Sequence, residues 1–464
     1  MKRRDWSRRD LLRTAGAAGL GAAGLSALGA CGGGESDASP GAVGAGGAQP
    51  ATGVSGSMYV PPPEAEGGWR RAEPGDLGID PERLSEAVMY HDNHRASTSH
   101  GAALLIVHRG HVVSESYVTG TEGGPESWTA TTCNDMKSST KSVFGTAVGV
   151  FLDEFSDRVD LETPLVGTSR ADSLIPQIWD RELTDDAKSR IRVKHAISMT
   201  SGHETREPWL APTERIRYPG YEGPFQMYEY CFGWWRFADV PDHHTLKFEP
   251  GSDFNYSNYG LEQLALAMRN VSGERVGPYV WDRVLGPIGM DRGLRDNEYG
   301  DMPYFDNREL NFAQTPGWGI GGSTGCDAYG ADMSESLYGT NSVVGSTFRC
   351  TARDFARLAY LWLHRGRWGD RQLVPQAWMD LATRRYQRED GTTPSPYGYT
   401  FWVMDGIEGV PGDLVMSRGH NLNHSFVIPS LDLVVVRQGN DNRRMDGDVP
   451  FADEVIRRIV AAVG

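Results

Sequence analysis

Lysine is scarce in this 464-residue chain, and positive charge is the minority sign. Lys and Arg together number 46 against 61 Asp and Glu, which gives a formal net charge of −15. This balance argues against a general nucleic-acid binder, because phosphate affinity comes from a basic surface. A hydrophobic content of 39% with 10% aromatics argues against a disordered chain. The six lysines are Lys2, Lys137, Lys141, Lys188, Lys194 and Lys247.

Cysteine is also rare, with five residues in the whole chain. Four of them have spacings that match no zinc site, and they are open to two readings: up to two disulfides in any of three pairings, or buried thiols. These four are Cys133, Cys231, Cys326 and Cys350. The histidine groups His91-Asp92-Asn93-His94 and His243-His244 also lack a recognised metal spacing, so we expect surface histidines, no metal and no cofactor.

No long hydrophobic run is present. The Gly/Ala/Leu stretch Ala15–Ala30 is too short and too glycine-rich to favour a membrane span. It follows a basic segment containing Arg8-Arg9, a pattern typical of a secretory signal over residues 1–30, and the paired arginines resemble a twin-arginine signal.

Leu28-Gly29-Ala30-Cys31 resembles a bacterial lipobox, in which the cysteine is lipidated after cleavage. The alternative is an ordinary cleavage site beside a chance cysteine. We expect an exported lipoprotein, periplasmic or on the cell surface, that meets the membrane through a lipid anchor. Residues 31–74, rich in Gly, Ala, Ser and Pro, predict a flexible tether, and residues 75–464 predict the folded domain.

Strand patterns stand at both ends of this domain and helical patterns in its middle. Two hairpins are predicted, Ala103–Val107 with Val112–Tyr117 and Ser425–Ile428 with Leu433–Arg437. Apolar spacing predicts helices at Phe144–Phe155, Leu261–Met268, Ala352–Leu363 and Phe451–Val463. The order favours an α/β fold, a sheet flanked by helices with an inserted, mostly helical domain.

Only one of the lysines has a serine three residues before it, in Ser138-Ser139-Thr140-Lys141. Because i and i+3 share one face of a helix, the Ser138 hydroxyl and the Lys141 ammonium are expected to lie side by side at the start of the helix predicted at Phe144–Phe155. A serine is a poor nucleophile until a neighbouring base removes its proton. The helix N-terminus would also stabilise the anion that forms on attack.

A second motif, Tyr256-Ser257-Asn258, could place a phenol and an amide on one loop facing Ser138. An ammonium beside Tyr256 favours its phenolate, which is the form that acts as a base. Without such surroundings, Tyr256 would be read as a surface aromatic before a helix.

Ser-x-x-Lys followed by Tyr-x-Asn resembles the serine β-lactamase superfamily, and most closely its class C branch with the related D,D-peptidases, esterases and amide hydrolases. Further stretches carry the likeness from about residue 100 to residue 440: Ile191–Gly202, Leu285–Met290, Thr351–Arg357 and Tyr397–Tyr399. The resemblance implies a β-lactamase-like antiparallel sheet. It also implies attack by Ser138 on a carbonyl, proton transfer shared by Lys141 and Tyr256, and release of the acyl-enzyme by water. Asn258 would bind Lys141 or the substrate amide, and the Ser138 N–H would be half of the oxyanion hole.

The third motif of the superfamily, Lys-Thr-Gly or His-x-Gly on the strand lining the site, is only partly matched. His420-Asn421-Leu422 fits best, with Leu422 where glycine is expected, and His424 is a competing alignment. By the resemblance, Asn423 would supply the second oxyanion N–H.

No lysine follows Lys247, so the β-lactam carboxylate would lack its usual anchor. The sequence therefore favours an ester, amide or peptide substrate. A D,D-peptidase or β-lactamase is the first alternative, and a non-catalytic ligand-binding lipoprotein is the second. The aromatic segment between Gly202 and Glu249 would either wall the acyl pocket or pack the helical domain.

Overall fold

A computed structural model describes residues 58–93, 101–120, 128–132, 134–204, 215–217, 231–237, 244–274, 276–290, 348–389, 391, 395–439, 445–446 and 449–464. The expected signal, Cys31 and most of the tether lie outside these residues. The folded unit begins at Tyr59, within the expected tether. Pro61 and Pro62 accept hydrogen bonds from the buried Arg357, at 2.7 and 2.5 Å, which is why the last part of that segment is packed.

A six-stranded antiparallel sheet is the main element, with strand order β2-β1-β12-β11-β10-β9. β1 pairs with both β2 and β12, so the N-terminal hairpin and the C-terminal hairpin share one sheet. The predicted hairpins and the predicted sheet are thereby confirmed. The strands are β1 (Ala102–His108), β2 (His111–Val118), β9 (Trp402–Val403), β10 (Val415–Gly419), β11 (Asn423–Ile428) and β12 (Leu433–Gly439).

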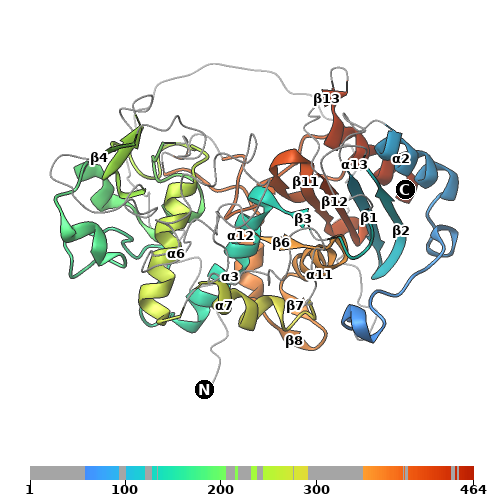
Figure 1. The fold of residues 1–464 in the computed structure, drawn as a ribbon, viewed down its shortest axis with the longest axis horizontal. Coiled ribbons are helices and arrows are strands. Elements are labelled where there is room, and N and C mark those ends of the chain that lie inside the picture. The colour runs from blue at the N-terminus through green and yellow to red at the C-terminus, as the bar shows by residue number, and fades with distance from the viewer. Residues whose placement is uncertain are drawn as a thin grey trace, which may run out of the picture. The chain divides into compact units, whose positions relative to one another are not determined.

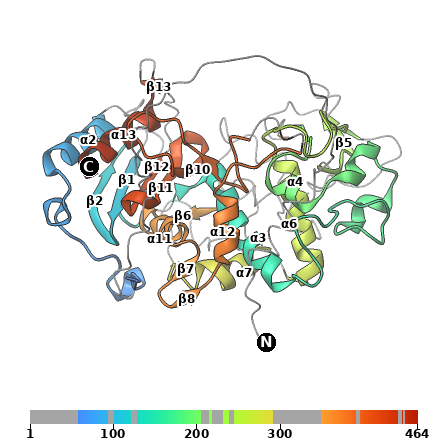
Figure 2. The same cartoon turned by 180° about the vertical axis from the view of Figure 1, so that it is seen from behind.

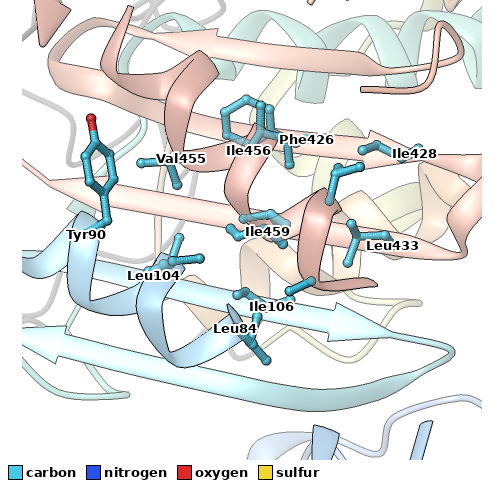
Figure 3. Close-up of a cluster of buried hydrophobic side chains, with 14 of the residues drawn as sticks. Leu84, Tyr90, Leu104, Ile106, Phe426, Ile428, Leu433, Val455, Ile456 and Ile459 are labelled. Carbon is cyan, nitrogen blue, oxygen red and sulfur yellow. The ribbon is translucent and has the colours of Figure 1, made fainter. Parts of the chain in front are cut away.

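Helices cover both faces of this sheet. α2 (Pro81–Asn93) and α13 (Phe451–Val463) bury an apolar cluster against one face, in which Leu104, Phe426 and Ile459 meet (Figure 3). α11 (Ala352–Leu363) packs on the other face. Because both faces are covered, β1, β11 and β12 are buried along their whole length, including the polar residues at the start of β11 and at the end of β12.

The helical part of the chain lies between β2 and β9 in sequence. Its long helices are α3 (Thr140–Glu154) and α6 (Asn258–Ser272), and α3 contacts both α6 and β10 (Figures 1 and 2). α3 therefore connects the sheet to the helical part. The helix predicted over Phe144–Phe155 forms, but it begins at Thr140 and ends at Glu154, with Phe155 as its C-cap. It was predicted to bury one apolar face, and it is instead buried on nearly every side.

The remaining elements are short. They are the helices α4 (Val193–Ile197), α7 (Val276–Val280) and α12 (Gln376–Ala382), and the strand pairs β3 (Asn134–Asp135) with β6 (Arg349–Cys350), β4 (Arg215–Arg217) with β5 (Trp235–Phe237), β7 (Arg367–Trp368) with β8 (Arg371–Gln372), and β13 (Met445–Asp446) with β14 (Val449–Pro450). Among the helices that the structure describes, none has both the length and the apolar character needed to cross a membrane.

Candidate active site

Ser138 lies in a 3₁₀ turn, η3 (Lys137–Ser139), that runs directly into α3. Lys141, one turn later, is fully buried, and its Nζ donates a hydrogen bond of 3.0 Å to Ser138 Oγ. The structure thus brings the predicted serine and lysine together. A buried ammonium that donates to a half-buried hydroxyl favours the alkoxide form, so that a neighbouring base can take the hydroxyl proton more easily.

The backbone around Ser138 is fixed by its neighbours. Lys137 has a left-handed φ of 50°, and its carbonyl accepts from Thr140 Oγ1 at 2.5 Å. Ser139 Oγ donates to the Asn423 carbonyl at 2.7 Å, so Ser139 has a structural partner and is no competing nucleophile. Ser138 stands at the start of a helix, where N–H groups have no intrahelical acceptor and can face a developing anion.

Tyr256 lies in the loop before α6, with its ring centroid 5.1 Å from Lys141 Nζ. Trp402 of β9 stacks on this ring, at 5.7 Å between centroids and 23° between planes. Tyr397 meets its edge at 6.2 Å. Burial raises the pKa of Tyr397 well above its usual range, so Tyr397 stays a neutral packing partner. The predicted Tyr256 is therefore held beside the serine–lysine pair by an aromatic cluster.

Asn258 is the first residue of α6 and is 6% exposed. Its Oδ1 accepts no hydrogen bond from the described part of the chain. A buried acceptor without a donor is costly, and such a group at a site indicates a place where a donor binds. This fits the predicted role of Asn258 toward a lysine or a substrate N–H.

The segment predicted as the third motif lies beside η3. Gly419 ends β10, and a Cβ placed on it would stand 2.1 Å from the Met136 carbonyl oxygen. Only glycine allows this approach of the strand to the nucleophile segment. His420 is exposed, and it opens the turn η9 (His420–Leu422) that leads into β11.

Leu422, which stands where the family pattern has glycine, has a φ of 61°, and Asn421 before it has 60°. This left-handed region is where glycine is favoured. The departure in residue type is thus accompanied by the backbone conformation of a glycine.

Asn423 requires a correction. Its N–H, expected as the second oxyanion donor, donates to the His420 carbonyl. Its side-chain Oδ1 accepts from Asn134 Nδ2 at 2.7 Å and from Gly439 N at 2.9 Å. Asn423 therefore joins β3, β11 and β12, and its N–H is engaged within the turn.

His424 lies on the opposite face of the sheet, because successive residues of a strand point to opposite sides. It pairs with Arg418 on β10 and Arg437 on β12 and contacts Phe426 in the cluster beneath α13. Burial, together with these two arginines, lowers its pKa to about 3, and neither ring nitrogen has a hydrogen-bond partner among the residues that the structure describes. The competing alignment at His424 is wrong, and His420 remains the candidate.

His91 was expected on the surface, and this is also wrong. It is fully buried on α2, where its Nδ1 lies 2.8 Å from Asp92 Oδ1 and its ring stacks on Phe451. Across the residues that the structure describes, no three His, Cys, Asp or Glu side chains are arranged to hold a metal ion. His94 and His243 lie outside those residues.

The structure describes only some of the residues on which the remaining sequence predictions depend. Cys231 and Cys350 are buried, while Cys133 and Cys326 lie outside the described residues. Of the aromatic segment before Glu249, Phe232 and Trp234 are described, and they pack edge to face in the interior at 5.3 Å. The other aromatic residues between Trp209 and Phe237 have no described side chain.

Sequence reasoning missed Trp402, Gly419 and Arg437. No local pattern marks Trp402 or Gly419, since their roles come from residues far along the chain. Arg437 did carry a signal: it is the one charged residue that ends the apolar run Leu433–Val436. A charge inside a buried strand indicates a specific partner.

The comparisons with known proteins agree with the fold and show the family. The family model described as Beta-lactamase matches residues 92–452, which is well over half of the chain. No curated protein matches.

Solved structures share the fold at low sequence identity. A novel penicillin-binding protein homologue from Caulobacter crescentus is 17% identical with a TM-score of 0.53, covering 83% of this chain and 98% of its own. A family VIII carboxylesterase is 17% identical with a TM-score of 0.52, covering 82% and 97%. An octameric penicillin-binding protein homologue from Pyrococcus abyssi is 18% identical with a TM-score of 0.54, covering 82% and 77%.

Proposed function

We propose that this chain, which belongs to the Beta-lactamase family, is a serine hydrolase that cleaves an ester or amide bond. The reaction would proceed through an acyl-enzyme on Ser138. One observation carries the proposal: Lys141 Nζ lies 3.0 Å from Ser138 Oγ and 5.1 Å from the centre of the Tyr256 ring. A nucleophile, a cation and a phenol are thus gathered at one helix start, as covalent catalysis by serine requires.

In the proposed reaction, Ser138 Oγ attacks the substrate carbonyl while its proton passes to the Lys141–Tyr256 pair. The tetrahedral anion is stabilised at the Ser138 N–H by the α3 terminus. Tyr256 then gives the proton to the leaving alcohol or amine, and the carbon–oxygen or carbon–nitrogen bond breaks. Water hydrolyses the serine ester, releasing the carboxylic acid and restoring Ser138.

The third-motif segment favours an ester or amide over a β-lactam. The chain has no lysine after Lys247 to bind a β-lactam carboxylate there. His420, the residue in that position, is exposed, and a neutral imidazole is a weaker anchor for an anion than an ammonium. The shared fold with a family VIII carboxylesterase is consistent with this preference.

The alternative, a D,D-peptidase or β-lactamase, has support from the fold shared with two penicillin-binding protein homologues. Stable labelling of Ser138 by a fluorescent penicillin would favour it. The non-catalytic ligand-binding lipoprotein is disfavoured by the preformed contact of Ser138 with Lys141.

A substrate panel tests the proposal. A p-nitrophenyl ester, an anilide and a chromogenic cephalosporin would be offered to the wild type, to Ser138→Ala and to Ser430→Ala, a matched change at an exposed serine. We expect turnover of the ester or anilide that Ser430→Ala keeps and Ser138→Ala loses with its fold intact. Retained turnover in Ser138→Ala would contradict the assignment.

We also propose export and lipid anchoring through Cys31, on the strength of the lipobox-like sequence. In a bacterial host, Cys31→Ser should lose labelling by radioactive palmitate and move from the membrane fraction to the soluble exported fraction. A variant that stays in the membrane fraction would contradict the anchor.

A further inference from the structure

The turn between β10 and β11 is held in an unfavourable backbone conformation. Asn421 and Leu422 both have φ near 60°. For an ordinary side chain this conformation costs roughly 1–2 kcal/mol per residue, and asparagine tolerates it better than leucine. Something outside the turn must therefore stabilise it.

Both ends of this turn are fixed to the nucleophile segment. At one end, Gly419 approaches the Met136 carbonyl so closely that no Cβ fits. At the other end, the Asn423 carbonyl accepts from Ser139 Oγ at 2.7 Å. A shift of the turn would consequently disturb the backbone on either side of Ser138, at Met136 and Ser139.

Arg437 supplies the stabilising contact from β12. Its side chain is 3% exposed, and its Nη1 donates to the Asn421 carbonyl at 2.8 Å and to the Leu422 carbonyl at 3.4 Å. These are the carbonyls of the two left-handed residues. A buried guanidinium with fixed donors is well suited to hold two neighbouring carbonyl oxygens in one geometry.

The guanidinium is itself oriented by α2. Arg437 Nε donates to His91 Nε2 at 3.4 Å, so the His91 proton lies on Nδ1 and is donated to Asp92 Oδ1 at 2.8 Å. Asp92 Oδ2 accepts from Ser116 Oγ of β2 at 2.7 Å. The chain of contacts explains why His91 is buried.

We propose that Arg437 is a positioning residue that holds the Asn421–Leu422 turn against the nucleophile segment, in place of the glycine that the family pattern has at Leu422. The expected effect of Arg437 on turnover rests on the proposed hydrolase function. Its effect on the turn itself does not depend on that function.

The test compares Arg437→Met and Arg437→Lys with Arg357→Met. Arg357 is a matched control, because it is also a buried arginine that donates to two backbone carbonyls, those of Pro61 and Pro62, and it does not contact the turn. Hydrogen exchange of the peptide covering residues 419–424 and kcat/KM for a p-nitrophenyl ester would be measured well below each variant's melting temperature.

We expect faster exchange at 419–424 in Arg437→Met, with β1 and α3 unchanged, and a fall in kcat/KM of about tenfold or more. Arg437→Lys keeps one donor group, so its exchange rate at 419–424 and its kcat/KM should lie between those of wild type and Arg437→Met. It also replaces the methionine variant in the test if that variant does not fold. Arg357→Met should leave both quantities near wild type.

Wild-type exchange at 419–424 in both Arg437 variants would overturn the proposal, as would equal changes in Arg357→Met. If wild type does not turn over the ester but Arg437→Met still exchanges faster than wild type at 419–424, the positioning role stands while the proposed hydrolase function fails.

Discussion

Two segments meet at the site, and they are built in different ways. In the nucleophile segment, Lys141 reaches Ser138 across three residues of one helix. In the turn between β10 and β11, the Asn421 and Leu422 carbonyls are held by Arg437 from another strand, and Arg437 is in turn oriented by His91, 346 residues away along the chain. The first geometry is local and the second depends on the assembled sheet.

This difference explains which of the two segments can depart in sequence from the family pattern. Helical spacing fixes the serine–lysine contact wherever the helix forms. The turn has no such internal rule, so its sequence can depart from the family pattern as long as distant contacts restore its shape. We therefore expect substitutions in the nucleophile segment to abolish the chemistry and substitutions around the turn to weaken it.

The largest effect is expected from Lys141→Met, which keeps the length of the side chain and removes its charge. Loss of proton transfer at Ser138 should lower kcat/KM for the p-nitrophenyl ester by about 10³-fold or more. Lys194→Met, at a lysine paired with Glu162 outside this contact, is the control. A Lys141→Met variant with more than about a tenth of wild-type turnover would contradict the local account.

A smaller loss is expected from Gly419→Ala. The added methyl would stand 2.1 Å from the Met136 carbonyl and 2.9 Å from the Asn423 carbonyl, so the strand must move away from the nucleophile segment. A displacement of about 1 Å can cost about 10²-fold in rate. Gly412→Ala, where a Cβ meets nothing within 4 Å, is the matched control. Equal kcat/KM in the two alanine variants would show that the close approach is unimportant.

The smallest effect on turnover is expected from His424→Leu, because His424 points away from Ser138. Its effect falls on stability instead. Burial and the charges of Arg418 and Arg437 hold the folded-state pKa of His424 near 3, against about 6.5 in the unfolded chain. As pH falls below 6.5, the unfolded state gains a proton that the folded state does not, and stability declines until about pH 3.

This difference is worth up to about 1.4 kcal/mol of unfolding free energy per pH unit within that window. Urea unfolding at pH 7 and pH 5 should therefore show a smaller loss of stability for His424→Leu than for wild type, with kcat/KM at pH 7 unchanged. A large loss of turnover would return His424 to the site.

Much of the fold could be predicted from the sequence, because its signals are local. The hairpins and the helices Ala352–Leu363 and Phe451–Val463 follow directly from apolar spacing and turn residues. Ser138, Lys141 and Tyr256 were found for the same reason, since short motifs mark them.

The rest depends on contacts between distant segments. His91 was misread because nothing near it in sequence shows that α13 and Arg437 cover it. The role of Asn423 was misread because the N–H that it was expected to offer is used by His420 in a turn whose shape no motif encodes. Choosing between His420 and His424 required knowing which face of β11 looks toward Ser138.

The most direct test of the central claim is covalent labelling. The protein would be treated with a fluorophosphonate probe, digested and mapped by mass spectrometry, with Ser138→Ala, Lys141→Met and Ser430→Ala in parallel. The account predicts one adduct on Ser138 in the wild type and in Ser430→Ala, strongly slowed labelling in Lys141→Met, and none in Ser138→Ala. An adduct on another serine, or none on Ser138 in a protein that turns over the ester, would contradict it.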